Sequence, residues 1–590
     1  MKIRLPQRIG LLRLSLLAIV VGVVTGFGAV LFRALIGLIH NLAFLGSFST
    51  SYDASAFTPA GPWGAFIILV PVIGGVVVTF LVTNFAPEAR GHGVPEVMDA
   101  IYYRDGVIRP VVAVVKSLAS ALSIGSGAAV GREGPIIQIG AAIGSSLGQI
   151  LTVAPWQRIT LVAAGAGAGI AATFNTPIGG VMFAIELMMP ELSARTFLPV
   201  ALATGTATFI GRIFFGLHPA FEIPAVLLMS QQPASLIALL LFALLGAFIG
   251  LAATGFIRGL SLAETLFERV GNPYLRHAVG MLMIGVLIYA LFETAGHYYV
   301  EGVGYATIQA ILSGSLALPW LLLLLFVAKL CATSVSLGSG ASGGVFSPSL
   351  FMGATIGGAF GALVDAVHPV AGVGVTTCAM IGMAAMVGGG TGAAMTAVTM
   401  IFEMTRDYDL VMPIIIAVAL AIGVRRLLSP ENIYTIKLVG RGHFVPKALH
   451  ANMFLVRRAR EVLEADVTIL PAEADFDAFL RQHAGASGYR HVIVTRGNHI
   501  AGVVRVNTSL RRGAEAAYSG VRLGDVAQRN FTIAREADIM FDVVQRMARH
   551  NAIMTVVVKG RGRGRPSEII GVISKEHIAD SVAESIRPFG

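Results

Sequence analysis

Long apolar segments separated by short polar stretches fill the first 440 residues. Several are shorter than the ~20 residues that a membrane-spanning helix needs, and glycine or proline interrupts them repeatedly. Such interruptions are typical of discontinuous helices that line a polar site within a membrane. The pattern therefore predicts an all-α polytopic membrane protein in which not every helix crosses the bilayer. The apolar segments lie at about 11–43, 63–84, 108–124, 133–151, 157–173, 177–189, 196–215, 233–267, 275–292, 318–337, 345–366, 373–388, 391–403 and 409–427.

Composition and charge agree with a membrane protein. Of the 590 residues 55% are hydrophobic and only 13% are charged, which is more apolar than a soluble protein of this length requires. The first apolar run, 14–32, is too long for a signal peptide and has no clear cleavage site, so it predicts a retained helix. The basic residues before it, Lys2, Arg4, Arg8 and Arg13, predict a cytoplasmic N-terminus. The net charge of +10 suits the inner leaflet better than a nucleic-acid partner.

The sequence offers little sign of metal or enzyme chemistry. Cys331 and Cys378 both lie among apolar residues, without disulfide or metal-ligand spacing. We find no nucleophile paired with a base and no complete phosphate-binding loop, so we expect no metal and no enzymatic activity. Trp63, Trp156 and Trp320 each lie beside the end of an apolar segment, as interfacial anchors do.

A glutamate flanked by glycines opens one of the apolar segments, in the stretch Gly131-Arg132-Glu133-Gly134-Pro135. A helix N-terminus carries partial positive charge and free N–H groups, so it attracts an anion, and Glu133 is placed to be one. A dissolved anion could take its place. Ionisable residues inside a membrane are costly and are functional by default. A structural glutamate paired with Arg132 is the alternative.

The two series of apolar segments resemble each other. In the first, Gly125-Ser126-Gly127 leads to Gly131 through Pro135; in the second, Gly338-Ser339-Gly340 leads to Gly344-Val345-Phe346-Ser347-Pro348. Paired glycine-rich breaks predict two inverted halves, about 10–215 and 233–440, with an ion site near the bilayer midplane. Converging helix N-termini would select an anion, whereas a cation path would need carboxylates. The candidate acids are few: Glu96, Asp99, Glu133, Glu186, Glu293 and Glu403.

Four ordered motifs carry a resemblance to a known family. They are Gly91-His92-Gly93-Val94-Pro95-Glu96, Gly131 to Pro135, Gly344 to Pro348, and Ile433-Tyr434. Over residues 10–440 the chain resembles the CLC family of chloride channels and chloride/proton exchangers. Lys116, the run Phe174-Asn175-Thr176-Pro177 and the run Glu403-Met404-Thr405-Arg406-Asp407-Tyr408 add to the agreement. The resemblance implies a homodimer in the inner membrane, with a separate ion path in each subunit.

The resemblance also implies roles for individual residues. Glu133 matches the gating glutamate, which occupies the outer anion site and leaves it when protonated or displaced. The Phe346 backbone N–H and the Tyr434 hydroxyl match the groups that hold the central anion, since neutral donors bind a halide without trapping it. The ion-binding set that the motifs imply is His92, Gly93, Arg132, Gly134, Val345, Phe346 and Tyr434.

Two positions depart from the family pattern. His92 stands where many members have a serine, and it can either donate to the central anion and titrate near neutral pH or serve a structural role. Leu187 stands where many exchangers carry an inner proton-transferring glutamate, with Glu186 just before it. Leucine cannot carry a proton, which weakens coupling without excluding it. We therefore expect chloride/proton exchange, with a passive voltage-gated chloride channel as the alternative and a CBS-containing divalent-cation channel as a distant one.

The composition changes after residue 440, where charges become frequent and short β-branched runs appear. Strand-rich patterning repeats at roughly 70 residues, which predicts a tandem α/β unit outside the membrane. It resembles a pair of cytoplasmic CBS domains, at 441–515 and 516–590. The aspartate that holds a nucleotide ribose in that family is replaced by Thr508 and His577, so we expect no cofactor and no bound adenine nucleotide.

A basic stretch near the end of the chain, Lys559 to Pro566, contains alternating glycine and arginine. It lies between two strand signals. A solvated loop is the favoured interpretation, with an anionic-lipid contact second and an RNA-binding tract third.

Overall fold

The computed structural model describes residues 8–217, 219–222, 235–445, 453–476, 478–479, 491–505, 520–560 and 565–586. The chain divides into two compact units, Met1–Val445 and Pro446–Gly590. Lys2, Arg4, Thr508 and the centre of the basic stretch, 561–564, lie outside the described residues.

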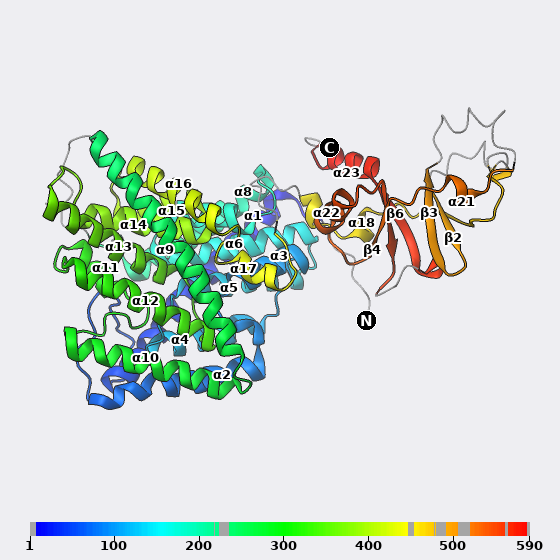
Figure 1. The fold of residues 1–590 in the computed structure, drawn as a ribbon. Coiled ribbons are helices and arrows are strands. Elements are labelled where there is room, and N and C mark those ends of the chain that lie inside the picture. The colour runs from blue at the N-terminus through cyan, green and yellow to red at the C-terminus, as the bar shows by residue number, and fades with distance from the viewer. Residues whose placement is uncertain are drawn as a thin grey trace. The chain divides into compact units, whose positions relative to one another are not determined.

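The N-terminal unit is helical throughout (Figure 1). Each predicted apolar segment coincides with a helix. Hydropathy missed three short helices: α3 and α11, which lie between these segments, and α17, which follows the last of them. The first half contains α1 (Leu11–His40), α2 (Leu69–Phe85), α3 (Val94–Tyr103), α4 (Val111–Gly125), α5 (Glu133–Ile150), α6 (Pro155–Phe174), α7 (Pro177–Phe183) with a π-turn (Ala184–Met188), and α8 (Ala194–Phe215). The second half contains α9 (Leu236–Glu268), α10 (Pro273–Ala295), α11 (Tyr305–Leu312), α12 (Pro319–Ser339), α13 (Phe346–Val367), α14 (Val375–Thr391), α15 (Ala394–Thr405) and α16 (Val411–Leu428), and α17 (Thr435–Gly440) follows.

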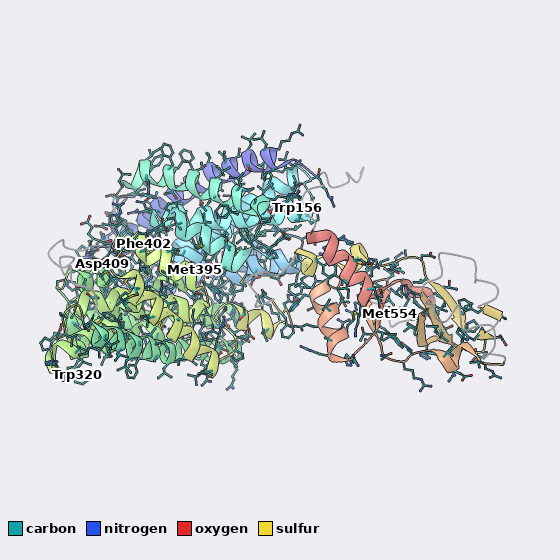
Figure 2. All side chains as sticks on the ribbon, turned by 90° about the horizontal axis from the view of Figure 1, so that it is seen from above. Trp156, Trp320, Met395, Phe402, Asp409 and Met554 are labelled. Carbon is teal, nitrogen blue, oxygen red and sulfur yellow. The ribbon has the colours of Figure 1, made fainter. Side chains whose placement is uncertain are left out.

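Among the described residues, eight helical stretches are long and apolar enough to cross a membrane. Four more apolar helices, among them α4 and α15, are too short to do so alone. This mixture confirms the polytopic class and the discontinuous helices. Trp156 and Trp320, labelled in Figure 2, each lie in the first turn of a helix, and Trp320 is 77% exposed.

The order of the helices repeats between the two halves. The pair α5 and α6 packs together as α13 and α14 do, and α1 packs on α8 as α9 packs on α16. Two buried lysines repeat as well. The Nζ of Lys116 on α4 donates to the carbonyl oxygens of Ala89 and Gly91, at 2.9 and 2.7 Å. Lys329 on α12 anchors the loop before α11 in the same way, through two carbonyl oxygens at 2.9 and 2.8 Å.

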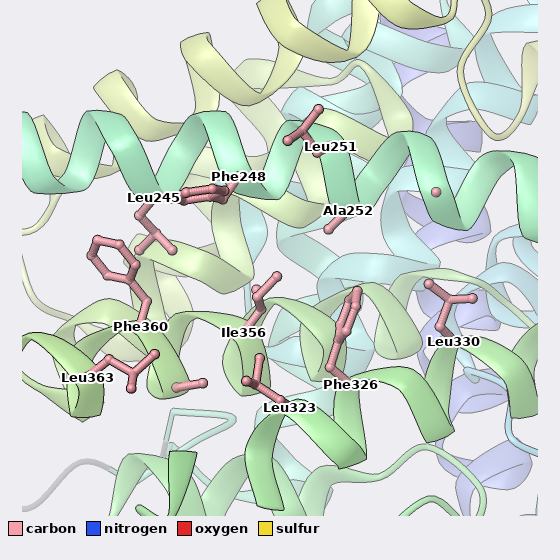
Figure 3. Close-up of a pocket in the computed structure, with 12 residues that line it drawn as sticks. Leu245, Phe248, Leu251, Ala252, Leu323, Phe326, Leu330, Ile356, Phe360 and Leu363 are labelled. Carbon is pink, nitrogen blue, oxygen red and sulfur yellow. The ribbon is translucent and has the colours of Figure 1, made fainter. Parts of the chain in front are cut away.

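An apolar pocket of about 510 Å³ lies between α9, α12 and α13 (Figure 3). Its wall is built from leucine, phenylalanine and other apolar side chains, including Leu245, Phe326 and Phe360. These side chains provide no donor for an ion, so the ion site lies elsewhere.

The C-terminal unit contains two small sheets of the same topology. In each, the first strand pairs in parallel with the second, and the second pairs antiparallel with the third. Ile493 and Val503 of the first sheet share a core with Met554, Val556 and Val572 of the second. The tandem α/β fold is thus confirmed. The elements are α18 (Ala459–Val462), β1 (Thr468–Pro471), β2 (His491–Arg496), β3 (His499–Arg505), α21 (Leu523–Val526), β4 (Phe531–Arg535), α22 (Met540–Arg549), β5 (Met554–Val558), β6 (Ile569–Ser574) and α23 (Lys575–Ile586).

Candidate functional site

Three of the glycine-rich breaks meet inside the N-terminal unit. Gly131 and Gly344 exchange backbone hydrogen bonds of 2.7 and 2.6 Å, so the break before α5 pairs with the break before α13. Gly91 pairs in parallel with Ser342, which adds the loop before α3. The N-termini of α3, α5 and α13 therefore converge, as the paired motifs predicted.

Glycine at these positions permits the close approach. A Cβ on Gly134 would lie 2.2 Å from the carbonyl oxygen of His92 and 2.9 Å from the Cα of Gly344. Gly93, at the N-cap of α3, has a φ of 80°, and a Cβ there would lie 2.8 Å from a Gln138 oxygen. At Gly134 the obstacles are backbone atoms, so a side chain there would force the loops apart, and at Gly93 the positive φ itself favours glycine.

Glu133 is completely buried, and its carboxylate lies at the N-terminus of α13. Oε1 accepts hydrogen bonds from the hydroxyls of Tyr305 and Ser347, the latter at 2.5 Å. Oε2 accepts one from the Ser347 backbone N–H at 3.2 Å. A buried carboxylate needs such donors to remain charged. In this structure the side chain of Glu133 itself occupies an anion site.

Arg132, predicted as part of the ion-binding set, lies beside this cluster. Its guanidinium carbon is 5.1 Å from the centre of the Tyr305 ring, a cation–π distance. Arg132 is only 9% exposed, and its Nε has no hydrogen-bond partner in the described part of the chain. Among the described residues, Arg132 forms no salt bridge with Glu133. The Glu133 carboxylate therefore depends on hydroxyl and backbone N–H donors.

A second group of donors lies around His92 and Tyr434. The two rings are 5.9 Å apart between centroids, and both side chains are at most 2% exposed. Within the described residues the buried Nδ1 of His92 has no hydrogen-bond partner. Val345 is the N-cap of α13 and Phe346 is its first residue, at the helix end where backbone N–H groups lack intrahelical acceptors. Unpartnered buried donors of this kind fit an anion.

Positive charges surround the histidine. Lys437, Lys116 and Arg441 all act electrostatically on the His92 ring. Hydrogen bonds from Arg441 to Glu96 raise the pKa of that guanidinium and keep it charged. Burial and these three cations oppose a further positive charge on His92, contrary to the hypothesis that the ring gains a proton near neutral pH.

The candidate acids other than Glu133 mostly have structural partners. Glu96 binds Arg441, and Asp99 binds Arg104 at 2.8 Å and His443 at 2.5 Å. Such pairing removes these acids as ligands for a cation.

Glu186 and Glu403 cap helices in opposite halves. The Glu186 carboxylate accepts from the backbone N–H groups of Met395 and Thr396 at the start of α15, at 2.8 and 2.7 Å. The Glu403 carboxylate accepts from Ile178 and Gly179 at the start of α7, at 3.1 and 2.7 Å. Glu186 thus has a structural capping role, and Leu187 beside it is buried.

In the C-terminal unit, His577 contacts an acid. Its Nδ1 lies 2.6 Å from Glu464 Oε1, and His491 Nε2 lies 2.8 Å from the other oxygen of that carboxylate.

Sequence reasoning missed the two hydroxyl donors of Glu133. Ser347 belongs to the motif Gly344 to Pro348, but the sequence predicted an ion-binding role only for its neighbours Val345 and Phe346. Tyr305 follows Gly302-Val303-Gly304, just as Val94 follows Gly91-His92-Gly93, and both residues begin a short helix after a glycine with φ near 80°. A comparison of the two halves at this level would have singled out Tyr305.

The fold and the site define a polytopic membrane protein whose two inverted halves bring helix N-termini to one buried point. Residues 74–426 match the family model described as voltage gated chloride channel. The chain belongs to this family of chloride-transport proteins.

Curated relatives extend the comparison. A putative chloride channel protein ClcB-like of Ralstonia nicotianae is 34% identical over 364 residues, which are 60% of this chain and 81% of that protein. An H(+)/Cl(-) exchange transporter ClcA of Vibrio parahaemolyticus is 32% identical over 431 residues, 71% of this chain and 88% of that protein.

Solved structures give the same fold. A slow cyanobacterial Cl-/H+ antiporter superposes with a TM-score of 0.63 at 26% identity, over 73% of this chain and 98% of that one. A eukaryotic CLC transporter superposes with a TM-score of 0.61 over 96% of this chain and 98% of that one, at 20% identity.

Proposed function

We propose that this protein exchanges chloride for protons across the inner membrane, with Glu133 as gate and proton carrier. The observation that supports it is the seating of the Glu133 carboxylate on the N-terminus of α13, where an anion would otherwise bind. The His92 and Tyr434 donors would hold a second anion deeper in the path. Relatives named as H(+)/Cl(-) exchange transporters support the coupling to protons.

The proposed cycle follows from charge competition. A charged Glu133 excludes chloride from its site, whereas a protonated one no longer competes for the same donors. Chloride can then enter as the proton leaves with the side chain. Because Gly93 and Gly134 have no side chains, the loops before α3, α5 and α13 can stay close together.

A passive chloride channel is the second candidate. Two observations favour it: Leu187 is apolar, and the carboxylate of its neighbour Glu186 is engaged in capping α15. The inner route for protons would then need water rather than a carboxylate.

The two mechanisms predict different reversal potentials. In liposomes with a fixed chloride gradient, adding a pH gradient should move the reversal potential of an exchanger. The reversal potential of a passive channel follows the chloride gradient alone. We expect a shift for the parent protein.

Glu133→Gln keeps the shape of the gate but removes its charge. The reversal potential should then lose its dependence on the pH gradient, while chloride flux persists or rises. Proton-linked chloride movement that is unchanged in this variant would contradict the role of Glu133.

We further propose that the protein is a homodimer with one path per subunit, and that its N-terminus and CBS-like unit, whose halves are 441–515 and 516–590, face the cytoplasm. No enzymatic activity and no bound nucleotide are assigned; His577 meets Glu464 where the resemblance would place a ribose ligand. Protease accessibility of the C-terminal unit in vesicles of known orientation tests the topology.

A further inference from the structure

The hydroxyls of Tyr305 and Ser347 come from two helices, α11 and α13, and meet on one oxygen of Glu133. Tyr305 is 3% exposed and Ser347 is fully buried, so water does not replace them as donors. Their oxygens also lie 2.9 Å from each other. Each hydroxyl has one proton to donate, and its hydrogen bond to Glu133 is stronger while the carboxylate is charged than when it is protonated.

The same donors suit a chloride ion. A halide accepts hydrogen bonds from hydroxyl and backbone N–H groups without a fixed geometry, and three such donors converge here: two hydroxyls and the Ser347 N–H. Tyr305 also lines a small pocket with Tyr52, Thr58 and Glu301.

We propose that Tyr305 and Ser347 are positioning residues of the gate, whose hydroxyls hold the charged Glu133 in place and pass to a transported chloride when Glu133 leaves. This inference rests on the proposed function, since it assigns the donors of the same site. Hydrogen bonds to a charged acceptor are roughly twice as strong as neutral ones, so protonation of Glu133 weakens the hold. The two hydroxyls thus set the acidity at which the gate opens.

Other charged or titratable groups act on the cluster, and they remain in every variant below. They are Arg132 and Arg33, which act on Tyr305, and Lys329 and Tyr434, which act on Glu133. A change caused by deleting one hydroxyl is therefore attributable to that hydroxyl.

The test has two backgrounds. With Glu133 present, Tyr305→Phe and Ser347→Ala remove donors that favour the charged carboxylate, so Glu133 takes up its proton at a less acidic pH. The pH of half-maximal chloride flux should rise by about one unit in each variant. In Glu133→Ala the flux no longer depends on this proton, so the hydroxyl deletions should leave its pH profile unchanged.

The Glu133→Ala background also reports chloride binding directly. There, Tyr305→Phe or Ser347→Ala should weaken chloride binding, measured by calorimetry, by about tenfold for the outer site. Tyr299→Phe and Ser349→Ala are matched controls, because their hydroxyls donate to the carbonyl oxygens of Ala295 and Val345 and not to Glu133. The controls should change neither the pH of half-maximal flux nor chloride affinity.

Three results would overturn the inference: an unchanged pH of half-maximal flux, a shift toward acid, or equal shifts in the controls. Ser347→Ala retains the backbone donor and tests the idea if Tyr305→Phe fails to fold. Failure of the proposed function looks different, because the parent protein would then carry no chloride or show no effect of Glu133→Gln on coupling.

Discussion

At the scale of single residues, the site uses neutral donors and one charged acceptor. Glu133 is the charged acceptor. The donors are uncharged groups, namely the hydroxyls of Tyr305, Ser347 and Tyr434 and the neutral imidazole of His92. Lys116 is a nearby cation, but its Nζ donates to two backbone carbonyl oxygens and not to the Glu133 carboxylate. Such an arrangement attracts chloride without holding it too tightly to pass.

His92 is expected to act as a neutral donor. The sequence raised the hypothesis that its protonation strengthens anion binding in acid, but Lys116, Lys437 and Arg441 oppose that charge. In a Glu133→Gln background, His92→Asn keeps a donor but cannot titrate. Chloride affinity between about pH 5 and 8 should therefore show the same pH dependence in both proteins. A rise of affinity in acid that His92→Asn abolishes would restore the original hypothesis.

At the scale of elements, each half caps a helix of the other. Glu186 from the first half holds the start of α15, and Glu403 from the second holds the start of α7. Met395 and Phe402, labelled in Figure 2, lie in the first and the last turn of α15. A carboxylate at a helix N-terminus satisfies free N–H groups and complements the helix dipole.

Glu186→Gln tests whether this acid is structural. It should lower the free energy of unfolding by about 1 kcal/mol, because a neutral amide caps less well. The shift of reversal potential with pH gradient should stay as in the parent protein. Glu403→Gln is the control and should behave alike. Loss of proton coupling in Glu186→Gln alone would mean that Glu186 carries protons.

Gly134→Ala tests the contact between the breaks. The added Cβ would meet the His92 carbonyl oxygen and the Gly344 Cα, so the loops must separate, at a cost of about 1–3 kcal/mol. Chloride flux should fall strongly. Gly205→Ala on α8 adds the same atom where nothing lies within 4 Å, and flux there should be normal. Equal flux in both variants would contradict the requirement for close packing.

At the scale of the whole molecule, the inverted repeat explains the choice of ion. Helix N-termini from both halves meet at one point, so their positive ends add. The acids that could have served a cation are bound instead to partners, as Glu96 is to Arg441 and Asp99 to Arg104.

Ion selectivity follows from this arrangement. Reconstituted protein should pass chloride, bromide or nitrate in preference to sodium, potassium or magnesium, because hydroxyls and backbone N–H groups bind anions. Bi-ionic reversal potentials measure the preference. Currents selective for cations would exclude the anion path and favour the divalent-cation alternative.

Local patterns alone determined much of this protein. Hydropathy located the long helices, glycine-rich repeats located the breaks before α5 and α13, and β-branched runs indicated β2, β3, β5 and β6 but not β1 and β4. Those features are properties of neighbouring residues, so the sequence displays them directly. The short helices α3, α11 and α17 were missed because each is too short for a hydropathy signal.

Tertiary structure decided which groups meet. Glu133 is 172 residues from Tyr305 and 214 from Ser347. Glu186 is 209 residues from Met395, whose N–H it caps. No local pattern encodes such pairs, because they form only when the two halves fold against each other. The sequence therefore determined that an anion-attracting helix terminus exists at Glu133, and the packing of α11 and α13 decided which hydroxyls hold it.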